Sequence, residues 1–318
     1  MEKASCPACK SQDSKIVYVL SSEALITGYW RENYVADISR LFDWRKSSIF
    51  FNKCRQCDLL WFHDAPVGDP DFYEELQKFP WYYPANKAEY SFAAQRIPDG
   101  SSVLEVGCGS GQFASHIPRC SYRGLEFNQK AVFAAQEQGL DVVIRDLEKE
   151  ADHRPDSYDV VCHFQVLEHV PYPLEFMQAC ARLLRPGGFL IVAVPAEDSF
   201  LSLVENGWLN LPPHHLSRWT DRALQSIFRT VGVDPVELWH EPVSLREKDW
   251  QQRTVTKAGL MDFWGAKPSV ITSRWGTIAD RILPRLPAFL HRASFRRGIR
   301  RYPQALRGHT VCVIGHKS

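Results

Sequence analysis

Four cysteines near the N-terminus have the spacing of a metal site. They form two pairs, Cys6-Pro-Ala-Cys9 and Cys54-Arg-Gln-Cys57. Two thiolates separated by two residues can bind one ion from a single tight turn, and two such turns complete a tetrahedral shell of four sulfur ligands. The spacing predicts a structural Zn²⁺ bound by Cys6, Cys9, Cys54 and Cys57. Unrelated reduced cysteines or a redox pair remain as alternatives, although neither pair lies in a strand–helix–strand context.

A glycine-rich turn further along the chain is typical of a nucleotide-like ligand site. Ser102–Val106 is a short apolar stretch that predicts a strand, and Gly107-Cys108-Gly109-Ser110-Gly111 follows it directly. We expect a helix to begin near Gln112, because strand, glycine loop and helix let the backbone approach a ligand closely. A dinucleotide dehydrogenase favours glycine at the sixth position of this loop, where this chain has Gln112.

An acidic residue ends the next predicted strand, Tyr122–Glu126. Glu126 lies about twenty residues after the glycine loop, where a carboxylate can accept hydrogen bonds from both hydroxyls of a ribose. Other apolar runs predict further alternating strands and helices. We expect strands over Asp141–Arg145, Tyr158–Cys162, Val233–Trp239 and His309–Gly315, and helices over Gln129–Gln138 and Asp221–Val231.

This succession resembles the class I S-adenosylmethionine-dependent methyltransferases. Val103–Gly111 is similar to the first motif of that family almost residue for residue. Tyr158–Val161 followed by Val166–Val170 resembles its fourth-strand motif, and Leu183–Val192 resembles its helix, turn and fifth strand. The resemblance covers about residues 101–235. It implies an α/β fold with a Rossmann-like, seven-stranded, mostly parallel sheet, S-adenosylmethionine as cofactor, and methyl transfer as the reaction.

The resemblance also implies which residues bind the cofactor. The glycine loop and Glu126 would fix its ribose and methionine parts, and Asp146 with Leu147 would flank the adenine. The expected cofactor-binding residues are Glu105, Gly107, Cys108, Gly109, Gly111, Glu126, Phe127, Asp146, Leu147 and Phe164.

Three histidines are the predicted catalytic residues. A hydroxyl that attacks a methyl group must lose its proton, and histidine suits that task near neutral pH. His169 follows the fourth strand, where members of the family place residues that face cofactor and acceptor. His214 and His215 lie in a segment that resembles the part of the family closing over the acceptor. A structural role remains open for each. No motif indicates metal-dependent transfer, because the acids after the fourth strand show no obvious set of three ligands.

Aromatic residues lie between the cysteine module and the core, at Phe72-Tyr73 and Trp81-Tyr82-Tyr83. This is the lid position in many class I methyltransferases. Two interpretations remain open: the aromatic rings stack on the cofactor or acceptor, or they hold the two parts of the chain together.

The cysteine module extends the resemblance to a subgroup that carries CPxC…CxxC pairs directly before the core, several members of which modify sugars, polyketides or surface glycans. The sugar C-methyltransferases among them have a further domain and a His-Gly-Gly-Ser motif. His240–Arg246 resembles that motif only loosely. We therefore favour O-methylation of a sugar, glycan or related small metabolite over C-methylation. An RNA or protein methyltransferase, or a non-catalytic S-adenosylmethionine-binding scaffold, is the alternative.

Charge is distributed unevenly along the chain. Its 318 residues are 45% apolar and 24% charged, as in globular proteins, and the formal net charge is +1. Residues 251–318 nevertheless hold 13 Lys/Arg against 2 Asp/Glu, a net +11. We expect a basic helical insertion between the last two strands. It could act as a lid that pairs with the acidic half or a protein partner, as a surface that docks on an anionic membrane, or, less favoured, as a nucleic-acid surface.

The division of the chain and its location follow from these patterns. We expect a zinc-ribbon module over residues 1–65, linker and lid helices over 66–100, the core over 101–246, the basic insertion over 247–305, and the last core strand over 306–318. The N-terminus has no apolar run, no stretch approaches the ~20 apolar residues of a spanning helix, and nine cysteines is an odd number. These features predict a cytoplasmic protein without a transmembrane segment, and a peripheral position at a membrane remains open.

Overall fold

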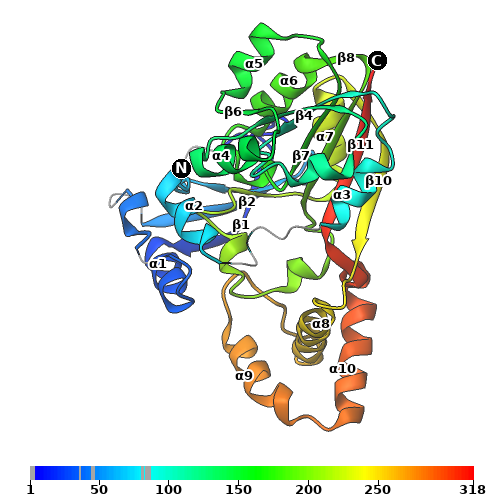
Figure 1. Cartoon of the computed structure of the whole chain (residues 1–318). Helices are drawn as coiled ribbons and strands as arrows, with labels where there is room; N and C mark the ends of the chain where they lie inside the picture. The colour runs from blue at the N-terminus through cyan, green and yellow to red at the C-terminus, as the bar shows by residue number, and fades with distance from the viewer. Residues whose placement is uncertain (1–3, 36, 44–46, 80–81, 83–86) are drawn as a thin grey trace.

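The computed structural model describes residues 4–35, 37–43, 47–79, 82 and 87–318 (Figure 1). A seven-stranded sheet forms the centre of the molecule, with the strand order β10-β11-β8-β7-β4-β5-β6. Strands β4 to β8 run parallel to one another, and β11 is antiparallel to both β8 and β10. The strands are β4 (Ser102–Val106), β5 (Ser121–Leu125), β6 (Val142–Val143), β7 (Tyr158–Phe164), β8 (Leu184–Pro195), β10 (Val233–Pro242) and β11 (Arg307–Lys317). The predicted α/β fold is confirmed.

Helices cover both faces of this sheet, because its central strands are apolar on both sides. On one face, Leu104, Val161 and Val192 pack against the helices α5, α6 and α7. On the other, Val103, Val160 and Ile191 pack against α3 and the 3₁₀ helix η2. The helices of the core are α3 (Ala88–Ala94), η2 (Gln112–His116), α4 (Gln129–Glu137), α5 (Leu147–His153), η3 (Leu167–His169), α6 (Pro173–Leu183), η4 (Phe200–Leu203), η5 (Trp208–Asn210) and α7 (Asp221–Thr230).

Two core elements are shorter than the sequence predicts. The helix expected after the glycine loop is the five-residue 3₁₀ helix η2, and Pro118 follows two residues after its end, where a longer helix could not continue. The strand expected over residues 141–145 is the two-residue strand β6. Among the described residues its one neighbouring strand is β5, which ends at Leu125 opposite Val143, so the pairing stops before Ile144.

A second, antiparallel sheet contains the cysteine module, with the strand order β1-β2-β3-β9. Its strands are β1 (Ser14–Ser21), β2 (Ser48–Cys54), β3 (Leu60–His63) and β9 (Ser217–Arg218). Strand β9 comes from the core segment and directly follows the predicted catalytic histidines. It pairs with β3 through Leu60 with Arg218 and Trp61 with Ser217. The N-terminal module is therefore joined by backbone hydrogen bonds to the segment that follows His214 and His215.

A helix, α1 (Ser22–Arg31), lies between the two cysteine pairs. The Ser21 side chain caps it by accepting a hydrogen bond from the Ala24 amide, and Leu25 and Tyr29 are buried one helical turn apart. Between this module and the core lie the 3₁₀ helix η1 (Ser39–Leu41) and the helix α2 (Pro70–Gln77).

Three helices separate β10 from β11 and project beyond the sheet (Figure 1). They are α8 (Lys248–Phe263), α9 (Arg274–Ile282) and α10 (Ala288–Arg301), with the 3₁₀ helices η6 (Leu283–Arg285) and η7 (Pro303–Leu306). Helices α8 and α10 touch at glycines: a Cβ on Gly298 would lie 2.3 Å from the carbonyl oxygen of Val255. Across the part of the chain that the structure describes, every helix is too short or too polar to cross a membrane.

Candidate active site

The glycine loop turns sharply at the carboxyl end of β4. Gly107, Gly109 and Gly111 all have positive φ angles, 69°, 54° and 76°, a conformation that favours glycine. The loop is held to the next strand because the Gly107 amide donates to the Leu125 carbonyl at 2.8 Å. A Cβ on Gly107 would also lie 2.6 Å from the side chain of Val166. The segment after β7 therefore packs directly against the loop.

Glu126 anchors the loop from the end of β5. Its Oε2 accepts a hydrogen bond from the Gly109 amide at 2.8 Å, and its Oε1 accepts from the amides of Phe127 and Asn128, each at 2.8 Å. A carboxylate has about four acceptor positions. One remains for a ligand hydroxyl beside the glycine loop, which is the place that the family gives to ribose.

The other expected cofactor residues lie around this loop in different environments. Asp146 caps α5 by accepting from the amides of Glu148 and Lys149, and Leu147 is buried behind it. Cys108 is buried against α4, and Phe127 is 72% exposed. Phe164, at the end of β7, is buried and packs against Tyr90 and Phe113.

Glu105 is a buried residue of β4 that lies two residues before the glycine loop. Its side chain is 1% exposed and accepts a hydrogen bond of 2.5 Å from the hydroxyl of Tyr122. Burial raises the pKa of Glu105 to about 8, more than the hydrogen bond from Tyr122 lowers it. The Lys87 ammonium group acts electrostatically on Glu105, and also on Glu168 and His169. The surroundings of the glycine loop and of the predicted catalytic histidine therefore share one cation.

The three predicted catalytic histidines form one cluster. The rings of His214 and His215 stack with their centroids 4.5 Å apart, and the His169 ring meets them edge-on at 4.6 and 4.8 Å. One ligand atom from each ring lies within 4.8 Å of the others. The amide of Leu216 holds the two chain segments together by donating to the Glu168 carbonyl at 2.8 Å.

The Nδ1 atom of each ring faces an oxygen acceptor. His169 Nδ1 lies 2.6 Å from the His214 carbonyl, and His214 Nδ1 lies 2.7 Å from the Leu209 carbonyl. His215 Nδ1 lies 2.9 Å from the side-chain oxygen of Asn210. Since carbonyl and amide oxygens only accept, each Nδ1 carries the hydrogen and each Nε2 presents a lone pair. Burial lowers the pKa of His169 to about 4 and those of His214 and His215 well below the usual value, so the rings are neutral.

Glu168 lies beside the cluster and is not among the site residues predicted from the sequence. Its side chain is 1% exposed, and neither carboxylate oxygen has a hydrogen-bond partner among the described residues. Oε1 lies 3.7 Å from His169 Nε2 and 4.0 Å from His215 Nε2. Burial raises the pKa of Glu168 to about 8. From the sequence we expected no set of three ligands after the fourth strand, and folding brings one together because His214 and His215 return to Glu168-His169.

Three aromatic residues of the expected lid, Phe72, Tyr73 and Tyr82, belong to one apolar cluster. Phe72 is completely buried against Tyr29 and Leu76 and belongs to the packing between module and core. The Tyr73 hydroxyl lies 3.4 Å from His169 Nδ1, and the Tyr82 hydroxyl lies 2.9 Å from His214 Nε2. Trp81 and Tyr83 lie outside the described residues.

The four N-terminal cysteines converge as the spacing predicts. Their sulfur atoms all lie within 4.8 Å of one another, with Cys6 3.6 Å from Cys57 and Cys9 3.6 Å from Cys54. The two turns are alike: the residues after the second cysteines, Lys10 and Asp58, have φ angles of 59° and 67°. Their amides donate to the carbonyls of Cys6 and Cys54.

This donor set fits a structural zinc ion. Tetrahedral zinc with Zn–S bonds of about 2.3 Å places sulfur atoms about 3.8 Å apart, close to the distances found here. Cys6, Cys54 and Cys57 are at most 1% exposed, which leaves no open coordination position for a substrate. The thiol of Cys57 lowers the pKa of Cys6 to about 5, whereas burial raises the pKa of Cys9 to about 11 and the Cys6 thiol raises the pKa of Cys57. The sulfurs therefore share their protons, which metal binding would displace, because a thiolate is the form that binds metal. The cluster packs onto the core: Lys10 pairs with Glu175 of α6 at 2.7 Å, and Arg222 of α7 donates to the Gln56 carbonyl.

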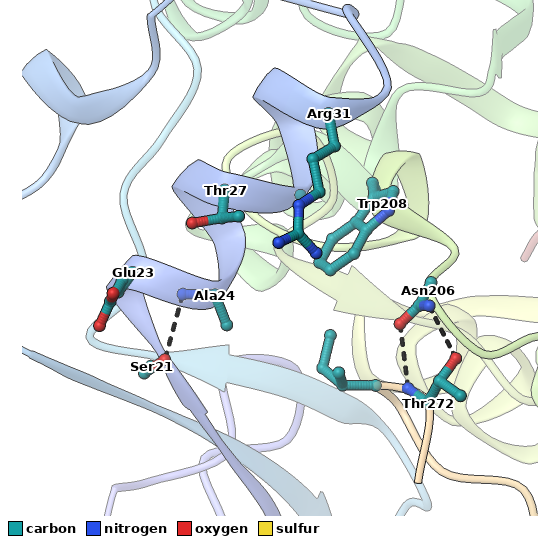
Figure 2. Close-up of a pocket in the computed structure, with 10 residues that line it drawn as sticks. Ser21, Glu23, Ala24, Thr27, Arg31, Asn206, Trp208 and Thr272 are labelled. Carbon is teal, nitrogen blue, oxygen red and sulfur yellow. Dashed lines mark hydrogen bonds between the residues drawn. The ribbon is translucent and has the colours of Figure 1, made fainter. Parts of the chain in front are cut away.

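A separate groove of about 450 Å³ lies between α1 and the loop before the histidines (Figure 2). Thr27 and Arg31 of α1 line one side, and Trp208 and Thr272 line the other. Figure 2 shows the Arg31 side chain beside the Trp208 ring. The ring packs closely on α1, since a Cβ on Gly28 would lie 2.4 Å from it. The groove lies behind the loop that supports the histidine cluster, and neither the histidines nor the glycine loop line it.

Comparison with known proteins identifies the family. The sequence profile described as "Methyltransferase domain" matches residues 80–238, half of the chain. The chain belongs to this family. It is a class I S-adenosylmethionine-dependent methyltransferase, as the glycine loop and the seven-stranded sheet indicate.

Two curated relatives have the name ubiquinone biosynthesis O-methyltransferase. The protein of Sodalis glossinidius is 32% identical over 163 residues, which are 47% of this chain and 61% of the relative. That of Escherichia coli O9:H4 is 29% identical over 214 residues, 58% of this chain and 85% of the relative. A crystal structure of a SAM-dependent methyltransferase from Archaeoglobus fulgidus has the same fold, with a TM-score of 0.51 and 18% identity over 78% of this chain and all of that chain.

Proposed function

We propose that this methyltransferase transfers the methyl group of S-adenosylmethionine to a hydroxyl oxygen of a sugar, glycan or related small metabolite. The observation that carries this proposal is the cluster of neutral His169, His214 and His215, of which only His169 is partly exposed, directly beside the segment that packs on the glycine loop. Relatives named as O-methyltransferases support oxygen as the acceptor atom.

The ten residues predicted from the family resemblance are proposed to hold the cofactor. Bound S-adenosylmethionine supplies an electrophilic methyl carbon on a sulfonium. The loop from Gly107 to Gly111 offers backbone amides at close approach, and the remaining acceptor position of Glu126 takes a hydrogen bond from a ribose hydroxyl. Asp146 and Leu147 flank the adenine from the start of α5. Methyl transfer is an in-line displacement, so positioning is the main contribution of the protein.

The histidine cluster is proposed to handle the acceptor proton. An alcohol becomes a better nucleophile as it loses its proton, and a group that assists this loss contributes about 10²–10⁴-fold. Burial keeps the three imidazoles neutral, so each Nε2 can accept a hydrogen bond or bind an electrophile. The hydroxyl of Tyr73, in α2, contacts His169, and the hydroxyl of Tyr82 contacts His214.

The cysteine cluster is proposed to bind structural Zn²⁺ and to stabilise the acceptor side of the site. Zinc binding is folding free energy for a module too small to have a large core of its own. The module transmits that stability through β3, which pairs with β9, and through the Phe62 amide, which donates to the Leu216 carbonyl at 2.9 Å. Both contacts fix the segment that presents His214 and His215.

The basic insertion is proposed to contact an anionic membrane surface, which would place a cytoplasmic enzyme at the membrane periphery. Phe289 and Leu290 of α10 are 69% and 40% exposed. The exposed arginines around them include Arg281, Arg285, Arg292, Arg296 and Arg300. Apolar side chains interleaved with arginine are typical of interfacial helices. No comparable observation favours RNA, and docking on a protein partner is the competing outcome.

The proposed function is tested with labelled S-adenosylmethionine. Calorimetry should detect binding of S-adenosylmethionine and S-adenosylhomocysteine, and failure to bind either would contradict the enzyme interpretation. A metabolite extract incubated with the protein and methyl-labelled cofactor should then yield a labelled product. Resistance of the label to mild alkali distinguishes an ether from a methyl ester. Cofactor binding without turnover on any fraction would favour a scaffold.

A further inference from the structure

We propose that His169, His214, His215 and Glu168 bind a divalent transition-metal ion that activates the acceptor hydroxyl. The proposal rests on the proposed O-methylation, since it assigns the activation of the hydroxyl to an ion instead of to a free histidine. The site is distinct from the cysteine cluster, which is closed and structural.

The orientation of the rings is the first observation. All three Nδ1 atoms are used as donors to oxygen acceptors, the carbonyls of His214 and Leu209 and the side chain of Asn210. This fixes the tautomer in which Nε2 carries the lone pair of each ring, and the lone pair of His214 faces the Tyr82 hydroxyl at 2.9 Å. Histidines that bind metals typically donate their other ring N–H to such an oxygen, which orients the ring and increases its basicity. Three rings from two chain segments share this arrangement.

The isolated carboxylate of Glu168 is the second, independent observation. Both of its oxygens are buried without a hydrogen-bond partner in the described part of the chain, and Oε1 faces the Nε2 atoms of His169 and His215 at 3.7 and 4.0 Å. Burying a polar group without a partner is costly. A cluster that served only for packing would leave both carboxyl oxygens of Glu168 without a hydrogen-bond partner in the described part of the chain. A cation between the carboxylate and the lone pairs would satisfy all four side chains together.

The geometry requires small movements on binding. Zinc-to-nitrogen bonds of about 2.1 Å bring neighbouring ligand nitrogens within about 3.4 Å, whereas one ring nitrogen from each of the three histidines lies within 4.8 Å of the others. The Glu168 Oε1 atom lies 3.7 Å from His169 Nε2 and 4.0 Å from His215 Nε2. Tilting the rings about their Nδ1 hydrogen bonds would close this gap. Tyr82, whose hydroxyl lies 2.9 Å from His214 Nε2, would have to give way or become a ligand. The acceptor would enter beside His169, whose side chain is 19% exposed.

The ligand set selects the class of ion. Imidazole nitrogens with one carboxylate suit zinc, cobalt, iron or manganese, whereas magnesium and calcium prefer oxygen ligands. Such an ion lowers the pKa of a bound hydroxyl. The hydroxyl proton leaves to solvent, the oxygen forms a bond to the methyl carbon, and the carbon–sulfur bond breaks with its electron pair on sulfur. The products are a methyl ether, S-adenosylhomocysteine and one proton, and no redox change occurs at the ion.

A second group of possible ligands, Glu241, Glu247 and His309, provides a matched control. There the His309 ring pairs with both carboxylates, and their charges raise the pKa of His309 although burial opposes this. The charged histidine already serves both carboxylates as a counterion.

Cobalt binding tests the proposal without an acceptor. Protein purified with zinc in the cysteine site is treated briefly with EDTA, dialysed, and titrated with Co²⁺ while visible absorption is recorded. We expect one equivalent to bind with d–d bands and without the thiolate-to-cobalt charge-transfer band that the cysteine site would give. Glu168→Gln and His215→Gln should each weaken binding at least 10-fold, while His309→Gln should bind as the wild type does. Thermal unfolding and calorimetry with S-adenosylhomocysteine report whether each variant is folded.

Each outcome decides the proposal. No cobalt bands in folded wild-type protein would overturn it, as would equal binding by wild type and folded Glu168→Gln, His169→Gln and His215→Gln. Loss of the bands in His309→Gln alone would place the ion at the control group and overturn the assignment. If cobalt binds as expected but S-adenosylhomocysteine does not, the metal site stands and the proposed methyltransferase function fails. If S-adenosylhomocysteine binds but cobalt does not, the proposed methyltransferase function stands and the metal site fails.

Discussion

The cysteine cluster and the histidine cluster are both groups of metal-ligand side chains, but they are built in different ways. The cysteines come in two local pairs, and each pair forms the same turn, ending in a residue with positive φ. The histidines and Glu168 come from two segments about 45 residues apart, after β7 and before β9. A ligand set built from local turns can be read from spacing, whereas one built from distant loops exists only after the sheet has formed.

The two clusters also differ in what surrounds them. Sulfur atoms 3.6 Å apart and almost fully buried leave no space for a further ligand. The histidine cluster leaves His169 partly exposed beside the segment that packs on the glycine loop. We infer that the first cluster holds the fold and the second performs chemistry. The two clusters are connected through the pairing of β3 with β9. Substitution of a cysteine should therefore disturb the histidine cluster, whereas substitution of a histidine should leave zinc binding by the cysteines unchanged.

Replacing a cysteine should have the largest effect. Cys54→Ser should remove the zinc and destabilise the protein by several kcal/mol, because metal binding contributes folding free energy directly. Metal analysis and thermal unfolding measure this, with the lone, partly exposed Cys120→Ser as the matched control. A Cys54→Ser protein that binds less than one zinc per chain but keeps the wild-type melting temperature would contradict a structural role for the cysteine cluster.

Removing the Glu126 carboxylate should weaken the cofactor site and leave both clusters intact. Glu126→Ala loses the charged acceptor of a hydrogen bond donated by a ribose hydroxyl, worth about 3 kcal/mol, so the affinity for S-adenosylmethionine should fall roughly 100-fold. Calorimetry measures the affinity, and Glu137→Ala on the exposed side of α4 is the control. Unchanged affinity in folded Glu126→Ala would mean that the ribose binds elsewhere.

The buried carboxyl of Glu105 should make stability depend on pH. Its pKa is raised by burial to about 8 in the folded protein, above the usual value of 4.5. The folded state therefore retains a proton that the unfolded state has lost, and this contribution to stability, complete below pH 4.5, diminishes as the pH rises towards 8. The loss has an upper limit of about 1.4 kcal/mol per pH unit.

Glu105→Gln removes that titration, so denaturant unfolding at pH 5.5 and 7.5 should show a shallower decline in the variant than in the wild type. Because Glu105 lies in neither cluster, the zinc content should not change. Identical declines in the two proteins would show that the carboxyl is not retained in its protonated form.

The smallest expected effect concerns the basic insertion, which belongs to neither cluster. A double change of Phe289 and Leu290 to serine should reduce cosedimentation with anionic phosphatidylglycerol vesicles several-fold, with little effect on cofactor affinity. Phe133→Ser, an exposed phenylalanine on α4, is the control. Equal cosedimentation of all three proteins would leave a lid or a protein contact as the role of α10.

The sequence could predict what depends on local pattern. The glycine loop, Glu126, the helix capped by Thr220 and the four cysteines all have short-range signals, and the structure places them in the expected elements. Helix α1 had such a signal too, since Ser21 precedes it as a cap. Strand β6 was overestimated because the length of an edge strand depends on its neighbour.

The remaining features depend on long-range packing. Glu168 appeared as an ordinary acid beside His169, and only the return of the chain at His214 and His215 shows that its carboxylate lies unpaired against two imidazoles. The pairing of β9 with β3 likewise has no signal in a two-residue strand. Lys87, which acts on both Glu105 and Glu168, could not be found without the fold.

A crystal structure of the zinc-containing protein soaked with Co²⁺ and S-adenosylhomocysteine tests the central claim most directly, because anomalous scattering at the zinc and cobalt absorption edges locates each ion separately. We expect zinc among Cys6, Cys9, Cys54 and Cys57, S-adenosylhomocysteine on the glycine loop, and cobalt between Glu168 and the three histidines. A histidine cluster without cobalt in crystals that contain both zinc and S-adenosylhomocysteine would contradict the account.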